Sequence, residues 1–371
     1  MSELRLTKPS VGSEELGEIA KVLESGYLTQ GPVVARFEEI VAAYVGVGHA
    51  FAMSSATTAL HLSLVAMGVG PGDEVVVPAY TFPATGNVVV QAGATVVFCD
   101  VDPATLAMTA ETLEPVLTAR TAAVMPVDPG GYPAPMREIV DLCAARGVKV
   151  VEDAACGLGA TRNGARCGSF PDVGCFSFHP RKVITTGEGG MITTNDDAIA
   201  DRIALLRSHG GRRTDGRYAY EDAGFNYRLS DVAGAMGIAQ MGKLESILER
   251  RRHLATRYSG QLAEVPGVAP PFIEPGAEPT FQSYVVMLDD EVDRDGVIAV
   301  MAQRGYETTV GTYGLHLEPF YRRTVGADPR DLPNSTRAAN QSLTLPLFPE
   351  MSEADVDGAV AALTGVLGGS S

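Results

Sequence analysis

The sequence predicts an α/β protein with two domains: a large domain on a mostly parallel sheet covered by helices, and a smaller C-terminal α/β domain. Two observations support this. Short apolar, β-branched runs alternate with helical stretches in the first part of the chain, which is typical of a buried parallel sheet with helices on both faces. From about residue 230, long helical patterns and a proline-rich connector replace that alternation. We therefore expect domains at 1–250 and 251–371.

The first elements are two helices with a short strand between them. Pro32 opens an apolar run with helical spacing, and 55–70 has the same spacing and ends in glycine. The strand is expected at 50–54. Four further valine-rich runs predict buried strands, at 74–80, 94–100, 121–127 and 148–153.

Polar residues stand near the carboxyl ends of these strands, where ligands of parallel sheets bind. They are Ser54, Asp100, Asp128 and Asp153. The C-terminal part begins with a helical pattern at 241–262, followed by the proline-rich connector at 265–279. An apolar run at 281–290, a helix near 293–304, a second run at 342–348 and a final helix complete the smaller domain.

Composition narrows the classes of function. The 371 residues are 45% hydrophobic and carry a formal charge of -16, so the overall field repels nucleic acid and anionic membranes. The N-terminus lacks the apolar core of a signal peptide and no stretch is long enough to span a membrane, so a cytoplasmic protein is expected. Five cysteines without a C-x-x-C pair predict neither disulfides nor a metal site.

One lysine stands in an unusual context. Lys182 lies in FSFHPRKVITTGEGG, between an aromatic run and a run of threonines and glycines. A lysine amine becomes a covalent catalyst when it condenses with an aldehyde, and pyridoxal phosphate is the common aldehyde cofactor. The run TTGEGG lacks the G-K-[ST] ending of a nucleotide-binding P-loop. The context therefore favours a pyridoxal-phosphate site over nucleotide triphosphate hydrolysis.

Such a cofactor needs a carboxylate for its ring nitrogen, a phosphate cradle and a flat contact for its ring. Asp153 follows an apolar strand and is the candidate carboxylate, with a capping aspartate as the alternative. Residues 54–58 begin a helix whose free N–H groups could hold the phosphate, or which is simply capped there. Phe82 is a candidate for stacking or for the core, and His179 for phosphate or substrate contact or a structural role.

Seven ordered blocks together resemble the DegT/DnrJ/EryC1/StrS aminotransferases, which are fold-type I pyridoxal-phosphate enzymes acting largely on nucleotide-linked keto-sugars. The blocks are 31–46, 54–64, 68–87, 93–106, 150–160 (VVEDAACGLGA), 174–196 and 224–252. The resemblance implies that Lys182 forms the Schiff base and that Asp153 pairs with the ring nitrogen. Relatives that deoxygenate sugars carry histidine in place of this lysine, so Lys182 favours transamination.

The same resemblance assigns the remaining cofactor contacts. It implies that Ala56, Thr57 and Ser177 hold the phosphate and that Phe82 stacks on the ring. Asn226 would reach the phosphate of the neighbouring subunit's cofactor, so the resemblance implies a homodimer with shared active sites.

Two positions depart from the family pattern. Cys156 stands where the family often has glutamine near the ring oxygen and the substrate, and Asp128 replaces a common histidine. A thiol cannot reproduce the donors and acceptor of an amide, so substrate placement is expected to differ. Candidate substrate contacts, or structural hydrogen bonders, are Arg228, His316 and Tyr321.

The function expected from these residues is transfer of an amino group, with glutamate as donor, to a keto group of a nucleotide-linked sugar. A ketocyclitol or other polyhydroxy ketone is the alternative acceptor. A non-catalytic regulator that binds pyridoxal phosphate is the alternative from another class.

Overall fold

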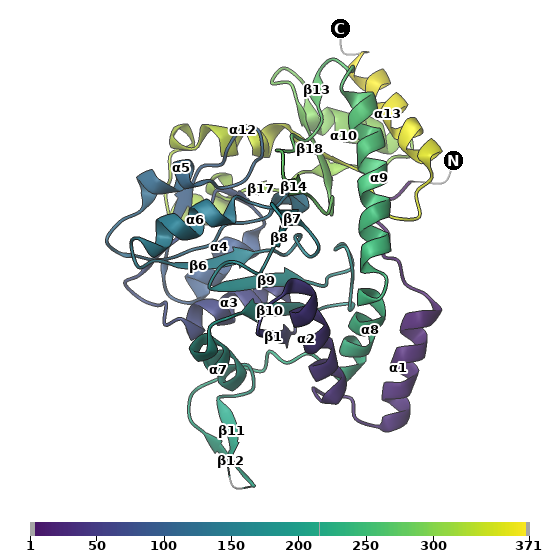
Figure 1. Ribbon diagram of the computed structural model, residues 1–371. Helices are drawn as coiled ribbons and strands as arrows, with labels where there is room; N and C mark the ends of the chain where they lie inside the picture. Colours follow the sequence, from purple (N-terminus) through teal and green to yellow (C-terminus); the bar gives the residue numbers. More distant parts are fainter. Residues whose placement is uncertain (1–3, 215, 369–371) are drawn as a thin grey trace.

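A seven-stranded sheet forms the centre of the computed structural model, which describes residues 4–214 and 216–368 (Figure 1). Residues 1–3 and 369–371, at the ends of the two predicted domains, lie outside the described residues. In spatial order the strands are β1 (His49–Met53), β10 (Gly190–Thr194), β9 (Val173–Ser177), β6 (Lys149–Asp153), β5 (Thr121–Val124), β2 (Glu74–Pro78) and β4 (Thr95–Cys99).

The expected mostly parallel sheet is confirmed. Strands β9, β6, β5, β2 and β4 pair in parallel, while β10 is antiparallel to both β9 and β1. The valine-rich runs form β2, β4, β5 and β6 where the sequence predicts them. Strands β9 and β10 were not predicted, because their apolar residues are interrupted by glycine, serine and threonine.

Helices cover both faces of this sheet, since alternate residues of one strand enter different cores. Val75 and Val77 lie in one hydrophobic cluster and Val76 in another. The first cluster includes residues of α3 (Ala56–Ala66), α4 (Pro83–Gln91) and α7 (Asp197–Leu206). Clusters on the opposite face include residues of α2 (Pro32–Val45), α5 (Ala110–Leu113) and α6 (Met136–Ala144).

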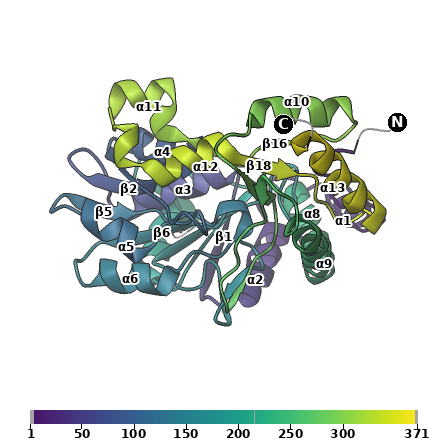
Figure 2. The same ribbon diagram turned by 90° about the horizontal axis from the view of Figure 1, so that it is seen from above.

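A second, antiparallel sheet lies in the C-terminal part of the chain. Its strands, in order, are β13 (Val268–Ala269), β15 (Tyr284–Leu288), β18 (Ser342–Leu345) and β16 (Thr309–Val310). Its core contains residues of α9 (Leu244–Leu262), α10 (Arg294–Gln303) and α13 (Glu353–Leu367). Figure 2 shows these three helices gathered at one end of the molecule. The predicted boundary at 250/251 falls inside α9 and stays a prediction.

The remaining elements connect or flank the two sheets. They are α1 (Ser13–Ser25), α8 (Asp231–Met241), α11 (Pro319–Thr324), α12 (Pro333–Gln341), β3 (Tyr80–Thr81), β7 (Thr161–Arg162), β8 (Ala165–Arg166), β11 (Gly211–Thr214), β12 (Arg217–Tyr220), β14 (Ala277–Glu278) and β17 (Tyr313–Gly314), with 3-10 turns at Glu114–Val116, Pro129–Gly131, Leu315–Leu317 and Pro329–Asp331. The β11–β12 hairpin projects from the body (Figure 1). Within the described ranges, no helix is both long and apolar enough to cross a membrane.

Candidate active site

The candidate site lies at the carboxyl edge of the seven-stranded sheet. Strand β6 ends there in Asp153 and β9 in Ser177, while β1 leads into the N-terminus of α3. Gly190 lies between β1 and β9, opposite Met53 and Ser177. A Cβ at this glycine would lie 2.4 Å from the carbonyl group of Ser55, so glycine lets the start of α3 approach the sheet.

Asp153 is buried, with 5% of its surface exposed. Its carboxylate accepts hydrogen bonds from the Thr85 hydroxyl at 2.7 Å and from the Ala155 N–H at 3.2 Å. Burial raises the pKa of Asp153, although the Thr85 hydrogen bond and the positive charge of Lys182 act in the opposite direction. A further cation bound here would favour the ionised carboxylate, as a protonated pyridine nitrogen would.

Lys182 is half-buried and its amine points to a thiol. Nζ donates to Cys156 Sγ at 3.1 Å, and the backbone N–H of Lys182 donates to His179 O at 2.8 Å. Its charge acts on Asp153. The structure thus brings Lys182 to Asp153 and Cys156, which lie 29 and 26 positions before it in the sequence.

The N-terminus of α3 offers unpaired donors at the same edge. Ser55 caps the helix by accepting from Thr58 N at 3.1 Å, which leaves the N–H groups of Ala56 and Thr57 at the first turn for an anion. Ser177 is buried at the end of β9, and its hydroxyl accepts from His179 N at 3.4 Å. These groups fit a phosphate.

Three other predicted cofactor contacts, Phe82, His179 and Asn226, are exposed or only half-buried. Phe82 is 62% exposed and its ring centroid lies 6.2 Å from that of Tyr313. His179 is half-buried, and its Nδ1 accepts from Arg181 N at 3.2 Å within a local turn. Asn226 is exposed, and its backbone forms an antiparallel bridge with Ser208.

The candidate substrate residues divide into two groups. Arg228 is half-buried and donates to Ser208 Oγ at 3.0 Å. His316 and Tyr321 are buried: the His316 ring is hydrogen-bonded to Thr336 Oγ1 at 2.8 Å, and the Tyr321 hydroxyl donates to Asn87 Oδ1 at 2.6 Å. These two side chains have partners inside the fold, and their contact with substrate stays a prediction.

Asp128 lies behind β6, on the face opposite the one that Asp153 occupies. It is buried with Glu152 and Cys167, and the three groups offer ligand atoms within 4.8 Å of one another. Burial raises the pKa of Asp128 to about 6 and that of Glu152 well above its usual range. Raised pKa values favour the protonated forms of the two acids, which could then share a proton.

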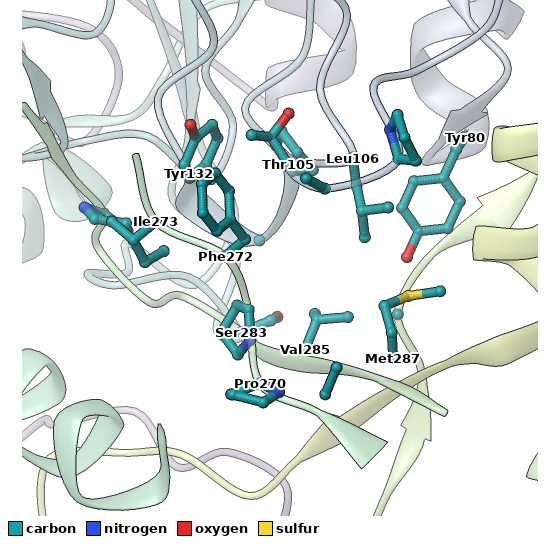
Figure 3. A pocket seen from close by; sticks show the side chains of 18 of the residues that line it. Tyr80, Thr105, Leu106, Tyr132, Pro270, Phe272, Ile273, Ser283, Val285 and Met287 are labelled. Atoms are coloured by element: carbon teal, nitrogen blue, oxygen red, sulfur yellow. The ribbon is translucent and has the colours of Figure 1, made fainter. Parts of the chain in front are cut away.

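A separate cavity of about 250 Å³ lies between loops of the large sheet and the C-terminal part (Figure 3). Tyr132 and Leu106 on one side face Ser283 and Val285 on the other. None of the predicted cofactor contacts lines it. The cavity is therefore separate from the candidate site.

Sequence reasoning missed three residues at the site. Thr85 donates to Asp153, Thr280 Oγ1 donates to Cys156 O at 2.8 Å, and Gln282 Nε2 donates to Arg181 O at 2.8 Å. Only Thr85 carried a signal, because it lies in one of the seven blocks. The other two contacts join segments more than 100 positions apart, which no local pattern predicts.

Comparison with known proteins defines the class. The model of the DegT/DnrJ/EryC1/StrS aminotransferase family matches residues 9–364, so the chain belongs to this family. The spore coat polysaccharide biosynthesis protein SpsC of Bacillus subtilis strain 168 is 37% identical over 97% of this chain and 96% of its own. GDP-perosamine synthase of Caulobacter vibrioides is 37% identical over 99% of both chains.

Solved structures agree with this assignment. The aminotransferase TlmJ from Streptoalloteichus hindustanus superposes with a TM-score of 0.93 at 36% identity, covering 99% of both chains. The sugar aminotransferase Spr1654 from Streptococcus pneumoniae in its PLP form has a TM-score of 0.93 at 26% identity, covering 98% of both. The protein is accordingly an aminotransferase dependent on pyridoxal phosphate.

Proposed function

We propose that this aminotransferase moves an amino group from glutamate to a keto group of a nucleotide-linked sugar, with Lys182 as the reacting amine. The observation that carries the proposal is the position of Lys182, whose positive charge acts on the buried carboxyl group of Asp153 near the N-terminus of α3. Support for the acceptor comes from the relatives: one is named for GDP-perosamine and another for a spore coat polysaccharide. Family membership weighs against the non-catalytic regulator.

Each side chain of the site would have a separate role in the reaction. Bound pyridoxal phosphate supplies an aldehyde that takes up amino groups and a ring that accepts negative charge. Lys182 would hold the cofactor covalently and, once released, carry a proton to and from the substrate carbon. Asp153 would keep the ring nitrogen protonated. Ala56, Thr57 and Ser177 would hold the phosphate through N–H and O–H groups.

The Lys182 assignment is tested by borohydride reduction of the holoenzyme and peptide mapping. The cofactor should be fixed on Lys182, and the Lys182→Ala variant should bind cofactor without covalent attachment while losing turnover by roughly three or more powers of ten. Reduced cofactor on another residue would refute the assignment.

The acceptor is tested by a panel of keto-sugar nucleotides and ketocyclitols, with glutamate and glutamine as donors. A nucleoside diphosphate should compete with a sugar-nucleotide acceptor, because the two share the nucleotide contacts. Turnover of a free ketocyclitol that is insensitive to this competitor would favour the alternative acceptor. Cys156, which departs from the family pattern, is the feature that keeps that alternative open.

The proposed homodimer is tested by mixing variants. If Asn226 serves the partner's phosphate site, Lys182→Ala and Asn226→Ala chains mixed after subunit exchange should form one site with both defects and one intact site. Part of the wild-type rate should return. Activity that stays at the average of the two variants, with exchange verified, would place both residues in the same chain's site.

A further inference from the structure

The segment 280–283 of the C-terminal part reaches back to the candidate site with two side chains. It joins β14 to β15. Thr280 Oγ1 donates to Cys156 O at 2.8 Å, and Gln282 Nε2 donates to Arg181 O at 2.8 Å. Both acceptors are backbone carbonyls of the large sheet's loops.

These two hydrogen bonds connect the segment 280–283 to the backbone of Cys156 and to the backbone next to Lys182. The side chains of these two residues are in contact with each other. Cys156 carries the sulfur atom that accepts from Nζ at 3.1 Å, and Arg181 directly precedes the lysine. A shift of the segment would therefore change the position of the Cys156 thiol, of the Lys182 amine, or of both.

A buried cation holds this segment from the opposite side. Arg251 on α9 is 1% exposed, and its Nη1 donates to Phe281 O at 3.1 Å, Gln282 O at 3.3 Å and Leu347 O at 3.1 Å. Among the described residues, no carboxylate lies within ion-pair distance of it. Burial lowers the pKa of Arg251 to about 10, so it remains charged at neutral pH. Its charge is directed at the segment's carbonyl groups.

The segment needs such support for two reasons. Phe281 has a φ of +48°, a left-handed conformation that costs a bulky residue free energy and persists only where the surroundings enforce it. Phe281 also lines the cavity of about 250 Å³, as does Ser283 (Figure 3). Without Arg251 the strained backbone therefore has free volume into which it can relax.

We propose that Arg251 is a positioning residue for Lys182 and acts through the segment 280–283. Its guanidinium fixes the carbonyls of Phe281 and Gln282, and the Gln282 and Thr280 side chains transmit that position to Lys182 and Cys156. The inference rests on the proposed function only in taking Lys182 as the reacting amine.

The experiment compares Arg251→Met and Gln282→Ala with the matched control Arg250→Met. Arg250 lies on the same helix and donates to Pro349 O and Met351 O, outside the segment. Hydrogen–deuterium exchange of the peptide 176–190 is measured first, because it needs no cofactor. The rate of covalent attachment of pyridoxal phosphate to Lys182 and the kcat and KM of the holoenzyme are measured next.

Gln282→Ala and Arg251→Met should increase exchange near Lys182 and slow covalent attachment about tenfold, as expected from losing one hydrogen bond that orients the amine. The kcat should fall by a similar factor with KM nearly unchanged. Arg250→Met should stay within about twofold of wild type, even if its Tm falls equally. Arg251→Lys, which keeps the charge, should recover part of the rate.

If Arg251→Met lowers the Tm while exchange and attachment match those of Arg250→Met, Arg251 is only structural and the proposal is wrong. Should Arg251→Met fail to fold, Gln282→Ala decides, and unchanged exchange and attachment in that variant overturn the proposal. Failure of the wild type to form a covalent link at Lys182 would refute the proposed function instead, while the exchange measurement would still judge the positioning role.

Discussion

Glu152 and Asp153 are neighbours on β6, yet the two sides of the sheet give them opposite chemistry. Successive side chains of a strand point to opposite faces. Asp153 therefore meets Thr85 and the charge of Lys182, whereas Glu152 meets Asp128, Cys167 and the N–H of Gly168.

Burial raises the pKa of both carboxyl groups, so burial alone does not distinguish them. Their partners do. The positive charge of Lys182 acts on Asp153, while Glu152 has a second acid, Asp128, beside it, which raises the pKa of Glu152 further. Of the two carboxyl groups only Asp153 faces a cation within the described part of the chain, and this difference supports our proposal that Asp153 pairs with the ring nitrogen of the cofactor.

The largest effect expected from breaking this contrast is that of Asp153→Asn. An amide cannot balance a positive ring nitrogen, and losing one charge-stabilising group in a dry site costs on the order of 3 kcal/mol, or roughly 100-fold in kcat. Cofactor affinity, measured by equilibrium dialysis, should change much less. A near-normal kcat would mean that Asp153 only caps the following turn.

Thr85→Val should have the next largest effect. It removes the hydroxyl that donates to Asp153 at 2.7 Å, and a hydrogen bond to a charged group contributes about 1.5–3 kcal/mol. We expect kcat to fall about tenfold with little change in KM for the acceptor. Thr85→Ser keeps the hydroxyl and is the control; equal losses in both variants would point to packing rather than to the hydrogen bond.

The buried acids on the other face of β6, Asp128 and Glu152, should make the stability of the protein depend on pH. The pKa of Asp128 rises from 3.8 to about 6 on folding, so its contribution is fully present below pH 3.8 and is lost as the pH rises through about 6. This shift corresponds to roughly 3 kcal/mol. Glu152, whose pKa is also raised, extends the loss to higher pH.

Glu152→Gln sharpens that test, because the amide donates to Asp128 without a proton to lose. The decline of Tm with rising pH should be shallower than in the wild type, and kcat should stay within about twofold, as for a residue remote from the reacting atoms. Identical slopes would contradict the shared proton. A metal ion found in the wild type but absent from the variant would assign the group to a cation.

The smallest effect on overall rate is expected at Cys156. Cys156→Gln should leave cofactor binding intact but change the relative kcat/KM of two acceptors by about tenfold, because an amide offers donors and an acceptor that a thiol lacks. A panel of acceptors measures this preference, and an unchanged ranking would show that the position does not contact the acceptor.

Local patterns in the sequence were sufficient for most of the fold. Valine-rich runs predicted β2, β4, β5 and β6, because the period and composition of a buried strand are local properties. The ordered blocks predicted the family, which the comparisons confirm. Lys182 was singled out from its place between an aromatic run and a run of threonines and glycines, and Asp153 from its position after an apolar strand. In the structure the charge of Lys182 acts on Asp153.

Tertiary structure decided what no local pattern contains. Strands β9 and β10 pair with neighbours in the sheet, although glycine, serine and threonine interrupt the apolar pattern that would have predicted them. The burial of His316 and Tyr321 depends on packing against distant elements. In the sequence, Arg251 is one of three consecutive arginines, and nothing local distinguishes it from its neighbours. Only long-range packing turns it inward onto the carbonyls of Phe281, Gln282 and Leu347, because contacts between segments distant in sequence arise from the assembled core and not from the periodicity of either segment.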